Sequence, residues 1–241
     1  MNNTTQGVEG LGDLEKTLII NELMQVPFDN RDEQWVNRFL QAIASANLKP
    51  ASQEVALGRD GYPYLFLETV VPNENFRAFV IDKQLPMILQ EGFGIVINAH
   101  NPRPDWVFSY GDIVNLELND EFYTDNSIFS GHQKKNETLE SDEKVLIGQP
   151  SEAIFPKYLR KQIRDFLIQS GVKNPKIMLM ARGYEDEERA SQDLVFNFIP
   201  DQFADKDTFN EIMRTIAWFL PRHYSFLCID EMSIENGFES L

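Results

Sequence analysis

The same order of patterned segments occurs twice along the chain, and this repetition limits the folds that the chain can adopt. In residues 30–98 a helical stripe is followed by two strand-like runs, a second short helix and a buried strand. Residues 155–229 follow the same order. Helices and strands that alternate in this way build sheets with helices packed on them. We therefore expect an α+β or α/β fold of two similar small modules, each a mixed β-sheet with helices packed on it.

The first module is expected at residues 28–118, after an N-terminal segment at residues 1–27. The first twelve residues are polar and predict disorder, whereas the following fourteen have apolar residues near helical spacing. Asn30 and Glu33 resemble a capping box for the next helix. The other elements predicted here are strands at 53–57, 64–70, 79–81, 93–98, 106–110 and 113–118, a turn at 58–61, and a short helix at 85–89 with Pro86 in its first turn.

Residues 119–143 form a polar, charged and aperiodic stretch between the modules. This composition is typical of a linker or a long loop. Its three aromatic residues, Phe122, Tyr123 and Phe129, can still attach the stretch to a surface.

The second module is expected at residues 144–235, and residues 236–241 form a tail that we expect to be frayed. The apolar stripe that starts at Phe155 predicts a helix, and Asp207 is the expected cap of a second helix. The predicted strands of this module lie at 145–147, 177–181, 194–199 and 224–229.

Two segments share motifs with a known family. Residues 85–99 contain a helix, a glycine and a hydrophobic strand, and an Asn101-Pro102 turn and a strand at 106–113 follow. Residues 145–150 read Val-Leu-Ile-Gly-Gln-Pro and precede a helix. These segments resemble the N-terminal and C-terminal modules of the bacterial SseB (enhanced serine sensitivity) family. The resemblance implies a cytosolic α/β protein with no established enzymatic activity.

The charge of the chain disfavours several classes of partner. The formal net charge is −16 and the sequence pI is about 4.6. Such a chain repels nucleic-acid phosphates and anionic membrane surfaces, so we expect neither as a partner. The single cysteine, Cys228, excludes an intrachain disulfide, and no signal peptide or spanning segment is evident. We therefore expect a cytoplasmic protein.

No pattern in the chain predicts a catalytic, cofactor-binding or metal-binding site. The three histidines form no metal-ligand pair, and the group of His223, Cys228, Asp230 and Glu231 reads better as a core cysteine near a polar strand end. Neither a nucleophile elbow nor a complete phosphate-binding glycine loop is present. We therefore expect no catalytic residues, no cofactor and no metal.

Three groups of residues are candidates for an interaction surface. Alternation places three aromatic residues of one predicted strand on a single face, which either packs under a helix or is open for binding. Four basic residues share one side of a helix, and they are either balanced by nearby acids or contact an anion or partner. Four consecutive acids form either a solvated loop or a patch for a basic partner. The three groups are Trp106, Phe108 and Tyr110; Lys157, Arg160, Lys161 and Arg164; and Glu185, Asp186, Glu187 and Glu188.

These observations favour a non-catalytic protein-binding or regulatory role with an unidentified protein partner. One alternative is an immunity-type protein that neutralises a basic toxin, because charge attraction speeds such association. A second alternative is an enzyme of unrecognised type, with a site assembled from scattered residues such as His100, Asp105, His223 and Asp230. Homo-oligomerisation through an exposed sheet edge also remains open.

Overall fold

The structure is a computed structural model that describes residues 10–71, 74–125, 127–129, 145–182, 191–234 and 236–241. The chain divides into two units: unit 1 comprises residues 1–113 and 120–122, and unit 2 comprises residues 114–119 and 123–241. None of the helices in the described ranges combines the length and the apolar character needed to cross a bilayer. Each unit is described by itself below.

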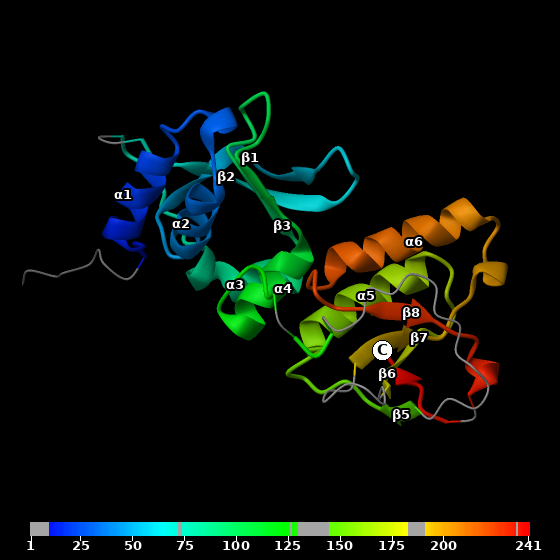
Figure 1. The fold of residues 1–241 in the computed structure, drawn as a ribbon. Helices are drawn as coiled ribbons and strands as arrows, with labels where there is room; N and C mark the ends of the chain where they lie inside the picture. The colour runs from blue at the N-terminus through cyan, green and yellow to red at the C-terminus, as the bar shows by residue number, and fades with distance from the viewer. Residues whose placement is uncertain (1–9, 72–73, 126, 130–144, 183–190, 235) are drawn as a thin grey trace, which may run out of the picture. The chain divides into compact units, whose positions relative to one another are not determined.

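Unit 1 is built on a four-stranded sheet with the order β1-β2-β3-β4 (Figure 1). The pairs β1/β2 and β3/β4 are antiparallel, and the pair β2/β3 is parallel. The elements are α1 (Leu14–Leu23), η1 (Phe28–Asn30), α2 (Glu33–Ile43), β1 (Leu48–Leu57), β2 (Pro63–Thr69), α3 (Ile81–Glu91), β3 (Gly94–Ile97), β4 (Trp106–Phe108) and the start of α4 (Tyr110–Asn119), whose residues 114–119 belong to unit 2.

Unit 2 is built on a five-stranded sheet with the order β5-β6-β7-β8, and β9 pairs with β6. The pairs β5/β6, β6/β7 and β6/β9 are antiparallel, and β7/β8 is parallel. The elements are β5 (Val145–Gly148), α5 (Lys157–Gln169), β6 (Lys176–Arg182), β7 (Ser191–Phe196), η2 (Pro200–Gln202), α6 (Lys206–Phe219), β8 (Phe226–Cys228), η3 (Glu231–Ser233) and β9 (Glu239–Ser240).

The two units repeat one arrangement, as the sequence predicts. The series α2-β1-β2-α3-β3 of unit 1 corresponds to α5-β6-β7-α6-β8 of unit 2. In both series the first two strands are antiparallel and the last two are parallel. The units differ in where the fourth strand is added, because β4 lies beside β3 whereas β5 lies beside β6. The expected fold of two similar modules, each a mixed sheet with helices packed on it, is therefore confirmed.

A row of stacked aromatic rings forms much of the unit 1 core. On α2, Trp35 stacks on Phe39 with ring centroids 5.0 Å apart. Phe39 in turn stacks on Phe108 of β4, and Phe108 stacks on Phe122 at 4.0 Å. Phe39 and Phe108 are fully buried, and Phe122 is 3% exposed. The predicted attachment of the 119–143 stretch by Phe122 is thus confirmed, and Phe129 similarly stacks on Tyr224 in unit 2.

The segment at 113–118, which the alternation predicts to be a strand, is part of helix α4. The reason is a capping box directly before it. The Ser109 N–H donates to Asp112 Oδ2 at 2.9 Å, and the Asp112 N–H donates to Ser109 Oγ at 3.1 Å. These bonds satisfy two backbone donors that a helix start leaves without partners, so the Gly111-Asp112 step begins a helix and does not interrupt a strand.

Helix α3 is longer than the predicted helix at 85–89, and it includes Ile81 from the expected strand at 79–81. Pro86 consequently lies inside the helix and not in its first turn. Ile81, Leu85, Ile88 and Leu89 are all buried at helical spacing. Burial of this stripe outweighs the roughly 3 kcal/mol that an interior proline costs.

Two predicted helix caps are displaced along the chain. Helix α2 is capped by Asp32, whose Oδ1 accepts a hydrogen bond from the Trp35 N–H at 2.9 Å, and not by Asn30. Helix α6 is capped by Asp205, which accepts from the N–H and the hydroxyl of Thr208, and not by Asp207. In each case an aspartate lies three residues before the donor, which is the capping geometry.

The C-terminal tail, predicted to be frayed, is part of the unit 2 sheet. Residues 239–240 form β9 and pair with Lys176 and Ile177. The Leu241 N–H donates to the Pro175 carbonyl at 3.1 Å, and the Leu241 side chain is 6% exposed. Phe238 anchors the tail, but it stands among polar residues in the sequence. Composition alone therefore predicts a frayed tail.

Candidate binding site on unit 1

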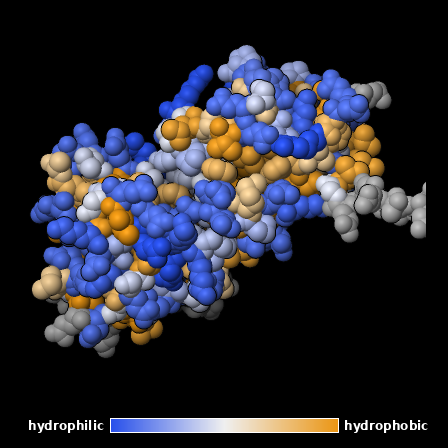
Figure 2. Space-filling view, turned by 180° about the vertical axis from the view of Figure 1, so that it is seen from behind, coloured by the Kyte–Doolittle hydropathy of each residue, from blue (hydrophilic) through white to orange (hydrophobic). Residues whose placement is uncertain are grey.

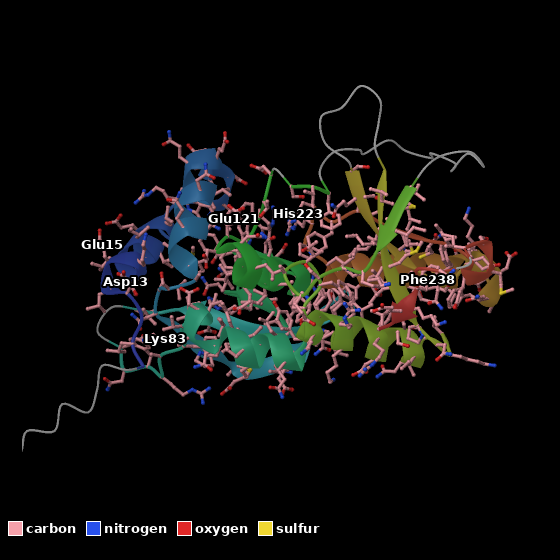
Figure 3. The ribbon with its side chains drawn as sticks, turned by 90° about the horizontal axis from the view of Figure 1, so that it is seen from below. Asp13, Glu15, Lys83, Glu121, His223 and Phe238 are labelled. Atoms are coloured by element: carbon pink, nitrogen blue, oxygen red, sulfur yellow. The ribbon has the colours of Figure 1, made fainter. Side chains whose placement is uncertain are left out.

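The outer face of each sheet, opposite the helix-bearing face, distinguishes the two units. In unit 2 this face carries Met178, Met180 and Val195, which form a buried cluster. Ile234 and Phe238 of the C-terminal segment pack against the cluster, and Phe238 is labelled in Figure 3. The chain thus covers the outer face of unit 2 with its own last residues.

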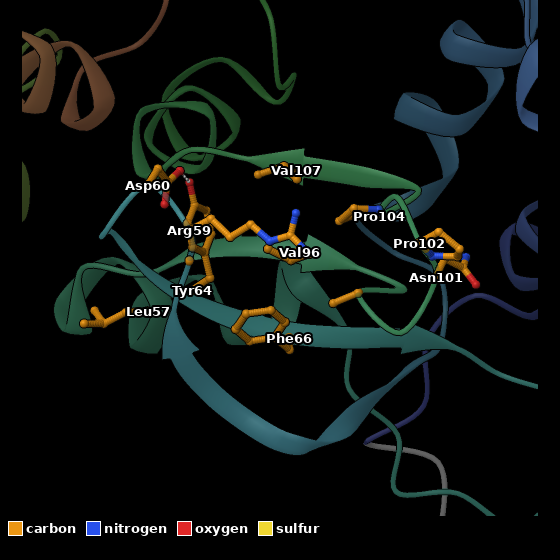
Figure 4. Close-up of a pocket in the computed structure, with 12 residues that line it drawn as sticks. Leu57, Arg59, Asp60, Tyr64, Phe66, Val96, Asn101, Pro102, Pro104 and Val107 are labelled. Carbon is orange, nitrogen blue, oxygen red and sulfur yellow. Dashed lines mark hydrogen bonds between the residues drawn. The ribbon is translucent and has the colours of Figure 1, made fainter.

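In unit 1 the corresponding face is hollowed. Phe66 of β2, Val96 of β3 and Val107 of β4 are neighbours in register and share this face. They line a pocket of about 370 Å³ (Figure 4). Val107 is 42% exposed, a large fraction for a valine in the middle of a strand. Water therefore reaches the apolar side chains that form the floor of the pocket.

The hairpin between β1 and β2 closes one end of the pocket. Gly61 has φ of +85° in the turn, as the predicted Asp-Gly step requires. Tyr64 donates its hydroxyl to Asp60 Oδ2 at 2.7 Å, and its ring lies against Gly94. A Cβ atom at position 94 would lie 2.6 Å from the Tyr64 ring and from the Phe108 carbonyl oxygen. Glycine at 94 is therefore needed for Tyr64 to lie flat across the sheet.

The loop between β3 and β4 closes the other end, and a buried polar network holds it. Asn98, with φ of +54°, accepts from the Thr69 N–H and donates to Asp105 Oδ2 at 2.7 Å. Asn101 donates to the same oxygen at 3.1 Å. Arg31 Nη2 lies 2.7 Å from Asp105 Oδ1, and both side chains are at least nine-tenths buried. The network fixes the path of residues 98–105 and so places Pro102 and Pro104 in the pocket wall.

A second hollow, of about 360 Å³, adjoins the first and shares Pro104 and Val107 with it. Trp106 also lines the second hollow. Successive residues of a strand point to opposite faces, so a hollow that contacts both Trp106 and Val107 lies at the edge of the strand. This agrees with the position of β4 at the end of the strand order.

Cations and aromatic rings alternate along the wall of the second hollow. The Arg103 guanidinium carbon lies 3.9 Å from the Phe28 ring centroid. The Arg31 guanidinium carbon lies 5.1 Å from Phe28 and 4.4 Å from the Trp35 ring. Each contact is within the range of a cation–π interaction. Arg31 pairs with Asp105 and lies inside this row of cations and rings. Arg103 is exposed and lies at the outer end of the row.

One exposed arginine lines each hollow. Arg59 extends from the hairpin turn across the pocket in Figure 4, and Arg103 lies on the β3–β4 loop. Within the part of the chain that the structure describes, neither guanidinium forms an ion pair. Asp60 supplies one carboxylate at the hairpin end. The site therefore has a small positive balance in a chain of net charge −16.

Apolar surface is concentrated on unit 1. Of the large hydrophobic residues that are exposed in the described ranges, those of unit 1 outnumber those of unit 2 by ten to five. Figure 2 shows orange apolar patches on the visible face of unit 1 among blue hydrophilic residues. The two hollows are concave parts of unit 1, and an exposed arginine lines each of them.

The three aromatic residues predicted to share one strand face do not form an open surface. Trp106 and Phe108 lie on β4, but Tyr110 is the first residue of α4. Phe108 and Tyr110 are fully buried, and the Tyr110 hydroxyl donates to the Leu89 carbonyl at 2.8 Å. Packing under a helix is therefore the correct alternative for Phe108, and Trp106 is the member that reaches the site.

The predicted basic side of α5 is balanced by nearby acids. Lys161 Nζ lies 2.7 Å from Asp165 Oδ2, and Arg164 Nη2 lies 3.3 Å from Asp165 Oδ1. The hydrogen bond from Lys161 is the main reason that the pKa of Asp165 is lowered. Arg160 donates to the Pro150 carbonyl, and Lys157 is exposed. Glu185, Asp186, Glu187 and Glu188 lie outside the described residues.

Each of the four residues considered for a scattered active site contacts different partners. His100 lies 3.4 Å from Glu68, and Asp105 pairs with Arg31. His223 packs against Phe129 and Tyr224. Asp230 caps η3 by accepting from the Met232 N–H. Neither hollow of unit 1 includes more than one of the four.

Metal-ligating and nucleophilic side chains are not gathered in the described ranges. No group of three or more His, Cys, Asp or Glu side chains there is arranged to hold a metal ion. Cys228 is partly buried, and its sulfur lies 3.3 Å from Met213 Sδ. Burial raises the pKa of the Cys228 thiol, which keeps it protonated and unreactive.

Comparison of the chain with protein-family models, with curated proteins and with solved structures found no match.

The sequence interpretation included Trp106 but missed the residues that give the site its character. Arg59 is a single charge within the predicted turn at 58–61, and Arg103 is a single charge directly after the Asn101-Pro102 turn. An arginine held between two prolines in a turn is a local indication of a fixed, exposed cation. No local pattern indicates that Phe66, Val96 and Val107 share an uncovered face, because this depends on where the helices pack.

Proposed function

We propose that this chain is a non-catalytic binding protein whose unit 1 recognises a partner protein through the outer face of its sheet. The observation that carries the proposal is the difference between two similar units. Unit 2 covers its outer face with Ile234 and Phe238, whereas unit 1 leaves a hollow lined by Phe66, Val96 and Val107. Concave apolar surface with a few polar groups is typical of binding sites, and exposed apolar patches mark interaction surfaces.

The anchoring of the site also supports binding. Buried hydrogen bonds hold Asp105 and Asn98, and the stack of Trp35, Arg31 and Phe28 holds the opposite wall. A wall that is already fixed loses little conformational entropy when a partner binds. The resemblance of residues 85–113 and 145–159 to the SseB family remains a prediction and agrees with a non-enzymatic role in the bacterial cytosol.

Site-specific photo-crosslinking tests this proposal. A benzoylphenylalanine placed at Val107 is expected to form a covalent adduct with one protein in cells of the source organism. The control carries the same residue at Ile168 on α5, which is apolar and similarly exposed, at 51% against 42%. An adduct formed only from position 107 and lost when Phe66 is replaced by Asp supports the proposal. The same set of adducts from both positions would refute it.

A further inference from the structure

The chemistry of the partner segment can be inferred from the shape and charge of the site. The two hollows share Pro104 and Val107, and together we call them the trough. Apolar side chains line it, with Arg59 in the first hollow and Arg103 in the second. A segment that lies along it must place apolar side chains against this lining and meet a guanidinium group in each hollow. Carboxylates are the protein groups that pair best with guanidinium.

Unit 2 provides an internal precedent for such an occupant. Its outer face is covered by the segment 229–241, whose sequence is Ile-Asp-Glu-Met-Ser-Ile-Glu-Asn-Gly-Phe-Glu-Ser-Leu. Ile229, Ile234 and Phe238 pack on the buried cluster, and Glu231 forms an ion pair with Lys176 at the strand end. The unit 2 sheet therefore accepts large apolar residues separated by acids on its outer face.

We infer that the trough of unit 1 binds an extended segment of a partner protein in which large apolar side chains are interspersed with carboxylates. This inference rests on the proposed function and names the chemistry of the partner. The apolar side chains contact Phe66, Val96 and Val107, and the carboxylates meet Arg59 and Arg103. An extended segment points alternate side chains to one side, which suits an apolar lining with a cation in each hollow.

The charge of the chain makes this recognition selective. With a net charge of −16, most of the surface repels an acidic segment, and the trough is a local exception. A basic segment is attracted to the chain as a whole but meets an arginine in each hollow of the trough. Like charges brought together at an interface disfavour the wrong partner. The trough therefore selects against lysine-rich segments, although the net charge of the chain attracts them.

A displayed library of random twelve-residue peptides, selected on the full chain, tests the inference. Sequences retained by the wild type but not by Val107→Asp are expected to contain Phe, Leu, Ile or Trp flanked by Asp or Glu. The most enriched peptide, labelled with fluorescein, is then titrated by fluorescence anisotropy. Its affinity is expected to fall at least tenfold when every Asp and Glu in it is replaced by Lys.

Matched variants locate the charge contribution. Arg59→Gln with Arg103→Gln is expected to weaken binding at least tenfold and to reduce its dependence on salt between 0.05 and 0.5 M, roughly the range over which screening becomes strong. Arg38→Gln with Arg77→Gln removes the same charge from exposed positions of unit 1 outside the trough, and is expected to leave affinity within twofold. Circular dichroism and thermal unfolding confirm that each variant is folded.

The outcomes separate this inference from the proposed function. Enrichment of basic or uncharged peptides, equal binding of the lysine peptide, or no enrichment would overturn the inference. If position 107 still crosslinks to one protein, the proposed function survives that failure. If position 107 gives no specific adduct and no peptide depends on Val107, both are wrong.

Discussion

Replacing Asp105 with Asn is expected to destabilise unit 1 strongly, because it removes one charge of a buried pair. Arg31 Nη2 lies 2.7 Å from Asp105 Oδ1, and the side chains are 10% and 7% exposed. Asp105 also accepts from Asn98 and Asn101. The side-chain amide of asparagine places an NH₂ group where Arg31, Asn98 and Asn101 already direct their own donors. The Arg31 charge then remains buried without its partner.

The size of the effect follows from this burial. Removing one partner of a buried ion pair costs about 3–5 kcal/mol, and Asn keeps one acceptor, so we expect about 3 kcal/mol. With a urea m-value of about 1.5 kcal/mol/M, the unfolding midpoint of unit 1 falls by roughly 2 M. Glu54→Gln is the control, because its pair with Arg77 is 53% and 67% exposed. An exposed pair of this kind contributes at most about 1 kcal/mol.

Tryptophan fluorescence can report on unit 1 alone. Trp35 and Trp106 belong to unit 1, and Trp218 belongs to unit 2. Both variants are therefore compared in a Trp218→Phe background, so that unfolding of the second unit does not contribute to the transition. Trp35 is a sensitive probe, because the Arg31 guanidinium lies 4.4 Å from its ring. A midpoint shift for Asp105→Asn no larger than that for Glu54→Gln would show that the buried network does not hold the loop.

Three further predictions concern unit 2. Hydrogen bonds from Lys176 and Asn197 lower the pKa of Glu231, so their contribution is present above the ordinary pKa near 4.5 and is lost as pH falls through the lowered value. Glu231→Gln should cost at most about 1 kcal/mol at pH 7 and progressively less as pH falls below 4.5, as followed by Trp218 fluorescence. Burial raises the pKa of Tyr224 to about 12, so stability should fall as pH rises from 10 to 12, and Tyr224→Phe should reduce this dependence in alkaline urea titrations, leaving the part that comes from Tyr158 and Cys228, whose pKa values burial also raises. Deleting residues 236–241 should destabilise unit 2 by about 3 kcal/mol, since it removes buried Leu241 and the Phe238 contact; an unchanged melting temperature would contradict this.

The order of elements could be predicted because it depends on local patterns. The helical stripe of α2 and the hydrophobic run of β3 are both readable from spacing. The pairing sense also follows, since a short turn joins antiparallel strands and a helix crossover joins parallel ones. The failure at α4 has an equally local cause. Ser109 and Asp112 form a capping box, but the glycine between them also resembles a break between two strands, which is what the alternation predicts here.

The site could not be predicted in the same way, because its parts are distant in sequence. Arg31 and Asp105 are joined only after α2 packs beside the β3–β4 loop. Phe28 contributes to the same wall from a short 3-10 helix that has no apolar period of its own. The aromatic alternation at Trp106 and Phe108 indicated the correct strand, but only the position of α2 determines that Phe108 is covered and Trp106 is partly accessible.

The two units differ in the path of the chain after the third strand of the repeat. After β8 the chain passes through η3, and Ile234 and Phe238 then cover the outer face of the unit 2 sheet. After β3 the chain instead returns as β4, which extends the sheet and continues into α4. The sheet of unit 1 is therefore extended beside β3, and its outer face lacks an equivalent covering segment among the described residues. A covering segment supplied by a partner would give unit 1 the packing that unit 2 obtains from its own C-terminus.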